Sequence, residues 1–181
     1  CFINPMSKKK YAYGIIPHLI DKDNEWLKQF NNQSKVKIID IIDSTAKRFV
    51  NEINECEVIL SSSLHGIICG DSYGIPSYWI ELSDKVIGKG YKFRDYFLSV
   101  DRPIKDSIKP KLNQKIEDIE YLFYDYKINI DLNKLLNACP FYKKNTKNSK
   151  FISKFNNEIE EKNIRKGMLS IKIRSILNRL K

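Results

Sequence analysis

The segment VILSSSLHGIICGDSYGIP, residues 58–76, constrains the fold of this chain more than any other. An apolar run that ends in three serines is typical of a buried strand followed by a tight turn. The apolar residues after the turn have helical spacing, and Gly74 and Pro76 close that segment. We therefore expect a strand, a turn and a helix whose first turn holds His65.

Short apolar runs alternate with amphipathic segments on both sides of this motif. We expect strands at residues 11–16, 36–42, 58–62 and 76–80. We expect helices at residues 24–32, 46–55, 64–73, 91–100, 113–126 and 131–138. Such alternation indicates βαβ units with right-handed crossovers. The predicted fold class is α/β, a Rossmann-like parallel sheet with flanking helices.

The net charge of +10 is concentrated at one end of the chain. Residues 1–140 carry 20 Lys and Arg against 19 Asp and Glu, whereas residues 141–181 carry 12 against 3. We divide the chain into an α/β domain (1–140), a polar linker (141–150) and a basic amphipathic helix (151–181). That helix suits an anionic membrane surface slightly better than a neighbouring domain. Nucleic acid is the weakest partner, because the α/β part has no basic stripe with interleaved aromatic residues.

Cysteine usage and the termini limit the class of protein further. The four cysteines are far apart and form no CxxC pair, which argues against a zinc site or a disulfide scaffold and fits a reducing cytoplasm. Cys56 and Cys69 are expected to be buried free thiols. No apolar run approaches the roughly 20 residues that span a bilayer. The N-terminus has no signal-peptide layout and does not begin with Met, so we expect a piece of a longer protein.

The candidate site lies where several predicted strands end. Ligands of parallel sheets bind beyond the carboxyl ends of the strands, and His18, residues 61–66 and residues 81–83 all fall there. Backbone N–H groups at a helix start favour anions, and a histidine moves protons near neutral pH. We expect an anionic substrate beside His65. The alternative is that His65 merely caps or packs the turn.

The other candidates are hydroxyl and cationic side chains around this histidine. The hydroxyls of Ser61, Ser62 and Ser63 suit an anion, or else they cap the helix and satisfy the turn. His18 either faces the same cleft or lies on the surface. A flexible segment carries three cations that can close over an anion or stay solvated, namely Lys89, Lys92 and Arg94. A serine nucleophile is disfavoured because no G-x-S-x-G elbow is present.

The stretches SSSLHGIICGDSYGIPSYWIELSD, KFRDYF and YGIIPHLIDKD resemble the C-terminal half of the polysaccharide pyruvyl transferase family, over residues 11–102. The resemblance implies a GT-B-like enzyme of which this chain is the second Rossmann-like domain, with an N-terminal domain missing. It also implies transfer of pyruvate from phosphoenolpyruvate to a sugar of a cell-surface polysaccharide, usually as a cyclic ketal. That scheme needs neither a metal nor a further cofactor.

Residue roles follow from the same resemblance. His65 matches the family's histidine and is the expected catalytic residue, and its neighbours Ser61, Ser62, Ser63, Leu64 and Gly66 are expected to bind substrate. Some members have an arginine where this chain has Ser63, so Lys92 or Arg94 is expected to take over donor binding. The acceptor is expected to be a lipid-linked saccharide. The protein is expected to be cytoplasmic, either free or peripheral on the inner membrane face. Two alternatives stay open: a GT-B-type glycosyltransferase that uses a nucleotide sugar, and a non-catalytic fragment.

Overall fold

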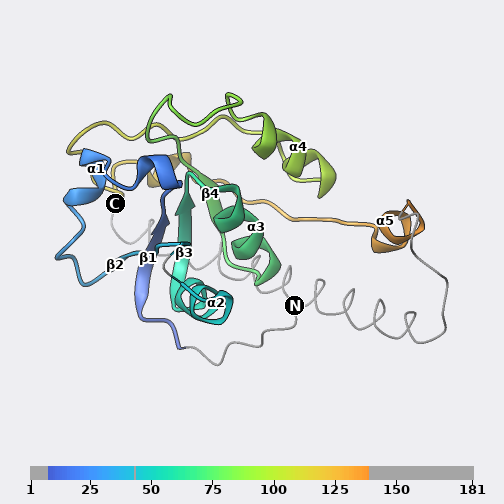
Figure 1. Ribbon diagram of the computed structural model, residues 1–181, viewed down its shortest axis with the longest axis horizontal. Coiled ribbons are helices and arrows are strands. Elements are labelled where there is room, and N and C mark those ends of the chain that lie inside the picture. Colours follow the sequence, from blue (N-terminus) through green and yellow to red (C-terminus); the bar gives the residue numbers. More distant parts are fainter. Residues whose placement is uncertain (1–7, 43, 139–181) are drawn as a thin grey trace.

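The computed structural model describes residues 8–42 and 44–138. A four-stranded parallel sheet forms its centre, in the order β2-β1-β3-β4 (Figure 1). Its strands are β1 (Tyr11–Ile16), β2 (Val36–Ile38), β3 (Cys56–Ser61) and β4 (Ser77–Trp79). The predicted α/β class with a Rossmann-like parallel sheet is confirmed.

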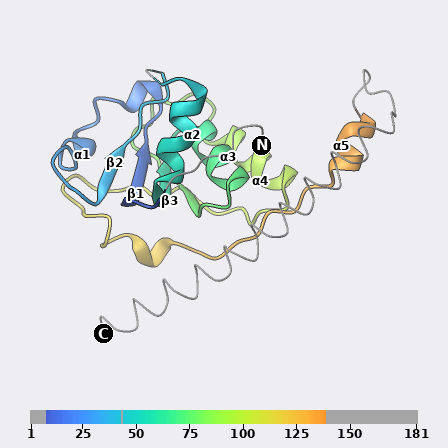
Figure 2. The ribbon, with the colours of Figure 1, turned by 90° about the horizontal axis from the view of Figure 1, so that it is seen from below.

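Helices and an irregular C-terminal segment cover the two faces of the sheet (Figures 1 and 2). On one face, α2 (Ala46–Asn54) packs Phe49 and Ile53 against Ile16 and Ile59 of the sheet. The other face is covered by α1 (Glu25–Lys28) and by residues 108–130, which include the 3-10 turn η2 (Glu120–Leu122). The remaining elements are η1 (Leu19–Asp21), α3 (Leu64–Ser72), α4 (Tyr91–Ser99) and α5 (Leu132–Ala138).

Local sequence explains where several of these elements begin and end. Thr45 caps α2 by accepting a hydrogen bond from the amide of Arg48 at 3.2 Å, and Asn24 caps α1 in the same way. The predicted strand at residues 36–42 stops at Ile38, because the Asp40 carboxylate accepts the Ile42 amide at 2.8 Å and turns the chain. The predicted helix at 24–32 is shorter, covering only α1.

The predicted helix at residues 113–126 is wrong. This segment contains only η2 and otherwise runs as irregular chain beneath the sheet. Several of its amides bond in short local turns, and the carbonyl of Gln114 accepts the Trp26 indole N–H at 2.7 Å. The apolar spacing arises because Ile116, Ile119 and Tyr126 are buried in the core against the sheet. The helical pattern was therefore a core-packing pattern on irregular backbone.

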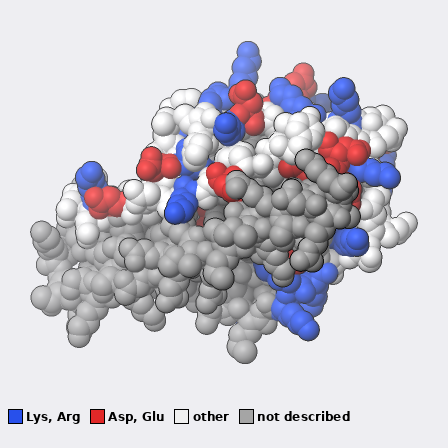
Figure 3. Space-filling model, turned by 180° about the vertical axis from the view of Figure 1, so that it is seen from behind, with Lys and Arg blue, Asp and Glu red and all other residues white. Residues whose placement is uncertain are grey.

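Charge on the described part of the chain is mixed. Figure 3 shows basic and acidic side chains intermingled over one face, which agrees with the near balance of charges in residues 1–140. Within the described residues, no helix has the length and apolar character needed to cross a membrane. The predicted linker at 141–150 and the predicted basic helix at 151–181 lie outside the described residues.

The strand order places a topological switch point between β1 and β3. The chain leaves β1 toward β2 on one side, whereas β3 lies on the other side of β1. Loops that leave the carboxyl ends of β1 and β3 therefore diverge, and ligands of open α/β sheets bind at such a switch point. His18 follows β1 there, and Ser62 follows β3.

Candidate functional site

The turn that connects β3 to α3, residues 61–63 (the serine turn), is fastened to the end of β1. The Ser61 hydroxyl is fully buried, 2.9 Å from the carbonyl oxygen of Ile16, and accepts the amide of Ser63 at 3.0 Å. The Ser62 amide also donates to Ile16, at 3.1 Å, and the Ser62 hydroxyl accepts the amide of His18 at 2.8 Å. These bonds hold the two strand ends, and hence His18 and α3, in fixed relation.

Asp21 extends this bonding to a third loop. Asp21 is 2% exposed, and its carboxylate accepts the hydroxyl of Ser62 at 2.8 Å and that of Ser83 at 2.5 Å. Ser83 belongs to the loop after β4, so one carboxylate joins the ends of three neighbouring strands. Sequence reasoning did not identify Asp21, although an acidic residue three positions after a strand-end histidine was a usable signal.

His65 lies in the first turn of α3 and is exposed. It lines a cavity of about 830 Å³ together with His18, Ser63, Leu64 and Lys92, which we call the histidine cavity. Much of the rest of its wall is apolar and includes Ala46, Phe49, Val50 and Ile68 of α2 and α3, while Ser44 and Ser72 also line it. The imidazole is therefore accessible to a ligand from solvent.

His18 is half-buried, and its ring orientation is fixed locally. Its Nδ1 atom accepts the amide of Ile20 at 3.3 Å, so the neutral ring carries its proton on Nε2 and can donate it to a ligand. Burial lowers the pKa of His18, and the positive charge of Lys92 lowers it further, against the opposing effect of Asp21. His18 is thus suited to act as a neutral hydrogen-bond donor at neutral pH.

A second cavity of about 600 Å³ lies beyond the end of β4, under the loop that leads to α4. We call it the carboxylate cavity, because its wall includes Asp21, Glu81, Asp84 and Asp106. Ser62, Lys89 and Arg94 also line it. Arg94 donates to the carbonyl oxygen of Lys89 at 2.7 Å, in a loop where Gly88, Lys89 and Gly90 all have positive φ.

The structure thus divides the predicted site residues into two groups. His18, Ser63, Leu64, His65 and Lys92 share the histidine cavity, whereas Ser62, Lys89 and Arg94 line the carboxylate cavity. Ser61 and Gly66 line neither of these two cavities. They pack together instead: a Cβ atom on Gly66 would lie 2.4 Å from the Ser61 hydroxyl oxygen. Of the two cations expected to replace an arginine at position 63, Lys92 lies in the cavity of His65.

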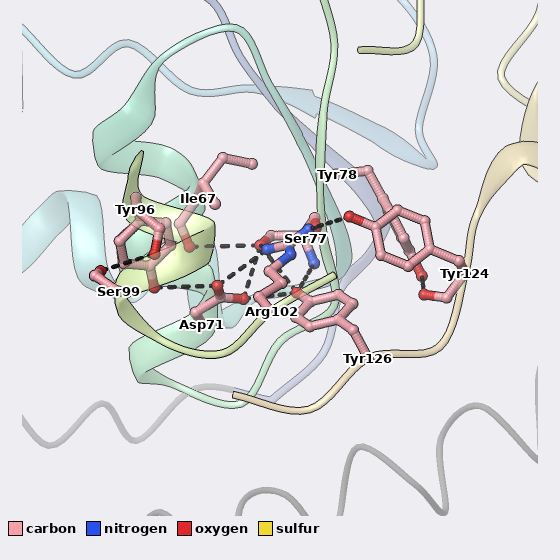
Figure 4. A network of polar contacts seen from close by, with 9 residues as sticks. All are labelled: Ile67, Asp71, Ser77, Tyr78, Tyr96, Ser99, Arg102, Tyr124 and Tyr126. Atoms are coloured by element: carbon pink, nitrogen blue, oxygen red, sulfur yellow. Dashed lines mark hydrogen bonds and ion pairs between the residues drawn. The ribbon is translucent and has the colours of Figure 1, made fainter. Parts of the chain in front are cut away.

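A buried polar network at the far end of α3 was missed by sequence reasoning (Figure 4). The Arg102 guanidinium, which is inaccessible to solvent, donates to the Asp71 carboxylate at 3.0 Å and to the Ser77 carbonyl at 2.5 Å. The Tyr126 hydroxyl donates to the same carboxylate at 2.6 Å. The available signal was Asp71 itself, an acidic residue within an apolar helix. This network lies in the interior and serves the fold.

Neither described cysteine suits nucleophilic chemistry. Burial raises the pKa of Cys56 to about 12 and that of Cys69 to about 11, so both thiols stay protonated at neutral pH. Both are free thiols: Cys56 is buried and Cys69 is half-buried. In residues 8–42 and 44–138, no group of three or more His, Cys, Asp or Glu side chains is arranged to hold a metal ion.

Comparison with known proteins connects this site to a family. The family described as polysaccharide pyruvyl transferase matches residues 2–84. An uncharacterised protein of Acanthamoeba polyphaga mimivirus is 36% identical over 119 residues, which cover 60% of this chain and 39% of that protein. The chain thus spans about two fifths of that relative. No solved structure matches significantly. The matched residues carry all four strands, both histidines and the serine turn, and over this part the chain is similar to the polysaccharide pyruvyl transferase family.

Proposed function

We propose that this chain is part of an enzyme that transfers a pyruvyl group from phosphoenolpyruvate to a sugar of a cell-surface polysaccharide. The observation that carries the proposal is the placement of His18, His65 and Lys92 in one cavity at the switch point of the sheet. Phosphoenolpyruvate carries a carboxylate and a phosphate in a small volume. A lysine ammonium, an Nε2–H donor and the amide groups at the start of α3 are the partners that such an anion requires.

The transfer needs one proton delivered and two removed. Protonation of the methylene carbon makes the central carbon of phosphoenolpyruvate electrophilic, and a sugar hydroxyl adds to it as a base accepts the hydroxyl proton. The carbon–oxygen bond to phosphate then breaks, and phosphate leaves with that electron pair. A second hydroxyl of the same sugar adds, loses its proton and closes the ketal. His65 is exposed to the cavity and serves as acid or base, while His18 and Lys92 bind the anion.

The proposal extends to three further features of the enzyme: its N-terminal domain, its acceptor and its location. An N-terminal domain would complete a GT-B-like cleft over the edge of the sheet that carries both cavities. The acceptor would be lipid-linked, and the basic residues 151–181 would hold the protein on the anionic inner face of the membrane. Support comes from the family match, from the charge of that segment and from the fraction of the mimivirus relative that this chain spans.

The test is phosphate release from phosphoenolpyruvate by the full-length protein in the presence of candidate lipid-linked glycans. We expect His65→Ala to lower kcat by about 10²-fold or more, the usual contribution of a general acid or base. Because His65 is exposed, the variant should unfold at the same denaturant concentration as the wild type.

The matched control is Lys47→Ala, an exposed residue of α2 that lines neither cavity and should keep full activity. Wild-type turnover by His65→Ala would remove the assigned role. Binding of a nucleotide sugar without binding of phosphoenolpyruvate would replace the proposal by a glycosyltransferase of related architecture. If the protein binds neither phosphoenolpyruvate nor a nucleotide sugar, it is a non-catalytic domain.

A further inference from the structure

The histidine cavity and the carboxylate cavity differ in charge. Among the residues that the structure describes, the wall of the histidine cavity contains no acidic side chain, whereas the carboxylate cavity has four. The carboxylate cavity is also lined by three cations, Lys89, Arg94 and Lys109, which leave one negative charge in excess. A small polyanion is favoured in the first cavity and meets like charges in the second. The two cavities are therefore built for different ligands.

We infer that the carboxylate cavity binds a neutral saccharide, the acceptor in the proposed reaction. A sugar presents hydroxyl groups that both donate and accept hydrogen bonds. Carboxylates accept from such hydroxyls, and the ammonium and guanidinium groups donate to them. The volume of about 600 Å³ lies within the ordinary range for small-molecule sites. The role of this saccharide as acceptor rests on the proposed function. Its chemical class rests on the cavity itself.

Two of the carboxylates are held in place by neighbouring groups. Glu81 accepts the hydroxyl of Ser107 at 2.7 Å and pairs with the Lys109 ammonium at 3.1 Å. Asp21 is held by the two serine hydroxyls described above. Carboxylates fixed in this way lose little further side-chain freedom when a ligand binds, which favours affinity. Glu81 also retains an exposed surface at the cavity wall.

An aromatic pair contributes to the apolar part of the cavity wall. Trp79 of β4 stacks on Phe93 of α4, with ring centroids 4.6 Å apart and an interplanar angle of 10°, and both line the cavity. Gly90 closes the loop over this pair; a Cβ atom there would lie 2.1 Å from the Trp79 ring. An apolar wall opposite several polar groups is the usual composition of a small-molecule site.

Shared elements place the two cavities next to each other. Ser62 of the serine turn lines the carboxylate cavity, and the adjacent Ser63 lines the histidine cavity. The first turn of α4 is divided in the same way: Lys92 lines the histidine cavity, and Phe93 and Arg94 line the other. A saccharide in the carboxylate cavity would thus lie beside the proposed donor site.

The test measures two ligands separately on the full-length protein. Calorimetry and saturation-transfer NMR would follow a panel of neutral trisaccharides, among them maltotriose and cellotriose, and phosphoenolpyruvate alone. We expect Asp106→Asn and Arg94→Ala each to weaken trisaccharide binding about tenfold or more while the Kd of phosphoenolpyruvate stays within twofold. Lys92→Ala should show the opposite pattern.

The outcomes separate the two proposals. If no trisaccharide of the panel binds the wild type, or if Asp106→Asn and Arg94→Ala leave its binding unchanged, the saccharide site is overturned. If these variants weaken phosphoenolpyruvate as much as the saccharide, the division between the cavities is overturned. If phosphoenolpyruvate does not bind but the trisaccharide binds and responds to both variants, the saccharide site stands and the pyruvyl donor is wrong.

Discussion

The two ends of α3 carry ionisable side chains in opposite environments. His65, in the first turn, is exposed in a cavity, whereas Asp71, near the last turn, is closed off from solvent beside Arg102. Removing two charges from water costs several kcal/mol per ion, and only close pairing with additional hydrogen bonds offsets that cost. The buried end is therefore constrained by folding. The exposed end bears no such constraint and is available to a ligand.

The buried end is more than one ion pair. The Arg102 guanidinium lies 3.7 Å from the centroid of the Tyr126 ring and 4.4 Å from that of Phe97. Burial raises the pKa of Tyr126 well above its ordinary value, and the nearby Asp71 carboxylate adds to the effect. The phenol therefore stays protonated and donates to that carboxylate. Arg102 Nε is the one atom in this cluster for which the described residues provide no hydrogen-bond partner.

The sharpest way to break the comparison is Arg102→Met. The substitution leaves the Asp71 carboxylate buried without its cation, and we expect the unfolding free energy to fall by about 3–5 kcal/mol. Urea unfolding followed by tryptophan fluorescence measures this loss. The double variant Arg102→Met/Asp71→Leu removes both charges and should recover part of it. A loss below about 1 kcal/mol in the single variant would show that this charge pair does not hold the fold.

A smaller effect is expected from Tyr126→Phe. The change removes a hydroxyl that donates to Asp71 at 2.6 Å and accepts the amide of Ser77 at 2.8 Å. Loss of a buried hydroxyl with partners left behind costs about 1–3 kcal/mol, measured by the same urea unfolding. Tyr124→Phe is the matched control. Its hydroxyl also belongs to the network, since it accepts from Arg102 at 3.2 Å, but Tyr124 is only half-buried and its loss should cost less. Equal losses in both variants would contradict the importance assigned to burial.

The same contrast explains what the sequence could predict. Strands and short helices were found because their apolar patterns and caps are local: β1, α2 and α3 lie within one or two residues of their predicted ranges. Residues 113–126 failed because their spacing reflects contacts with the sheet from far along the chain. The sequence placed His18 and His65 near each other by the rule that ligands of parallel sheets bind beyond the carboxyl ends of the strands.

The division of the site into two cavities was beyond the sequence. Lys92 and Arg94 are two residues apart and yet line different cavities, and Phe93 between them stacks on Trp79. The Arg102–Asp71 pair joins residues 31 positions apart, and no local sequence pattern predicts such a contact. Charges that meet through tertiary structure, whether in a cavity or in the core, require the fold to be known first.

The smallest effect sharpens the comparison at the exposed end. The pKa of His18 is lowered mainly by burial and by the charge of Lys92, so the folded protein binds its proton less readily than the unfolded chain, whose histidine titrates near 6.5. Between these two pKa values the unfolded state binds more protons, so the contribution of His18 to stability is present above pH 6.5 and is lost as the pH falls. Because the ring is only half-buried, we expect this contribution to stability to be less than about 1 kcal/mol.

His18→Gln should flatten the pH dependence of the unfolding free energy between pH 7.5 and 5, and Lys92→Ala should flatten it in part. If the pH dependence of the unfolding free energy is unchanged in His18→Gln, the histidine cavity does not shift the pKa of His18.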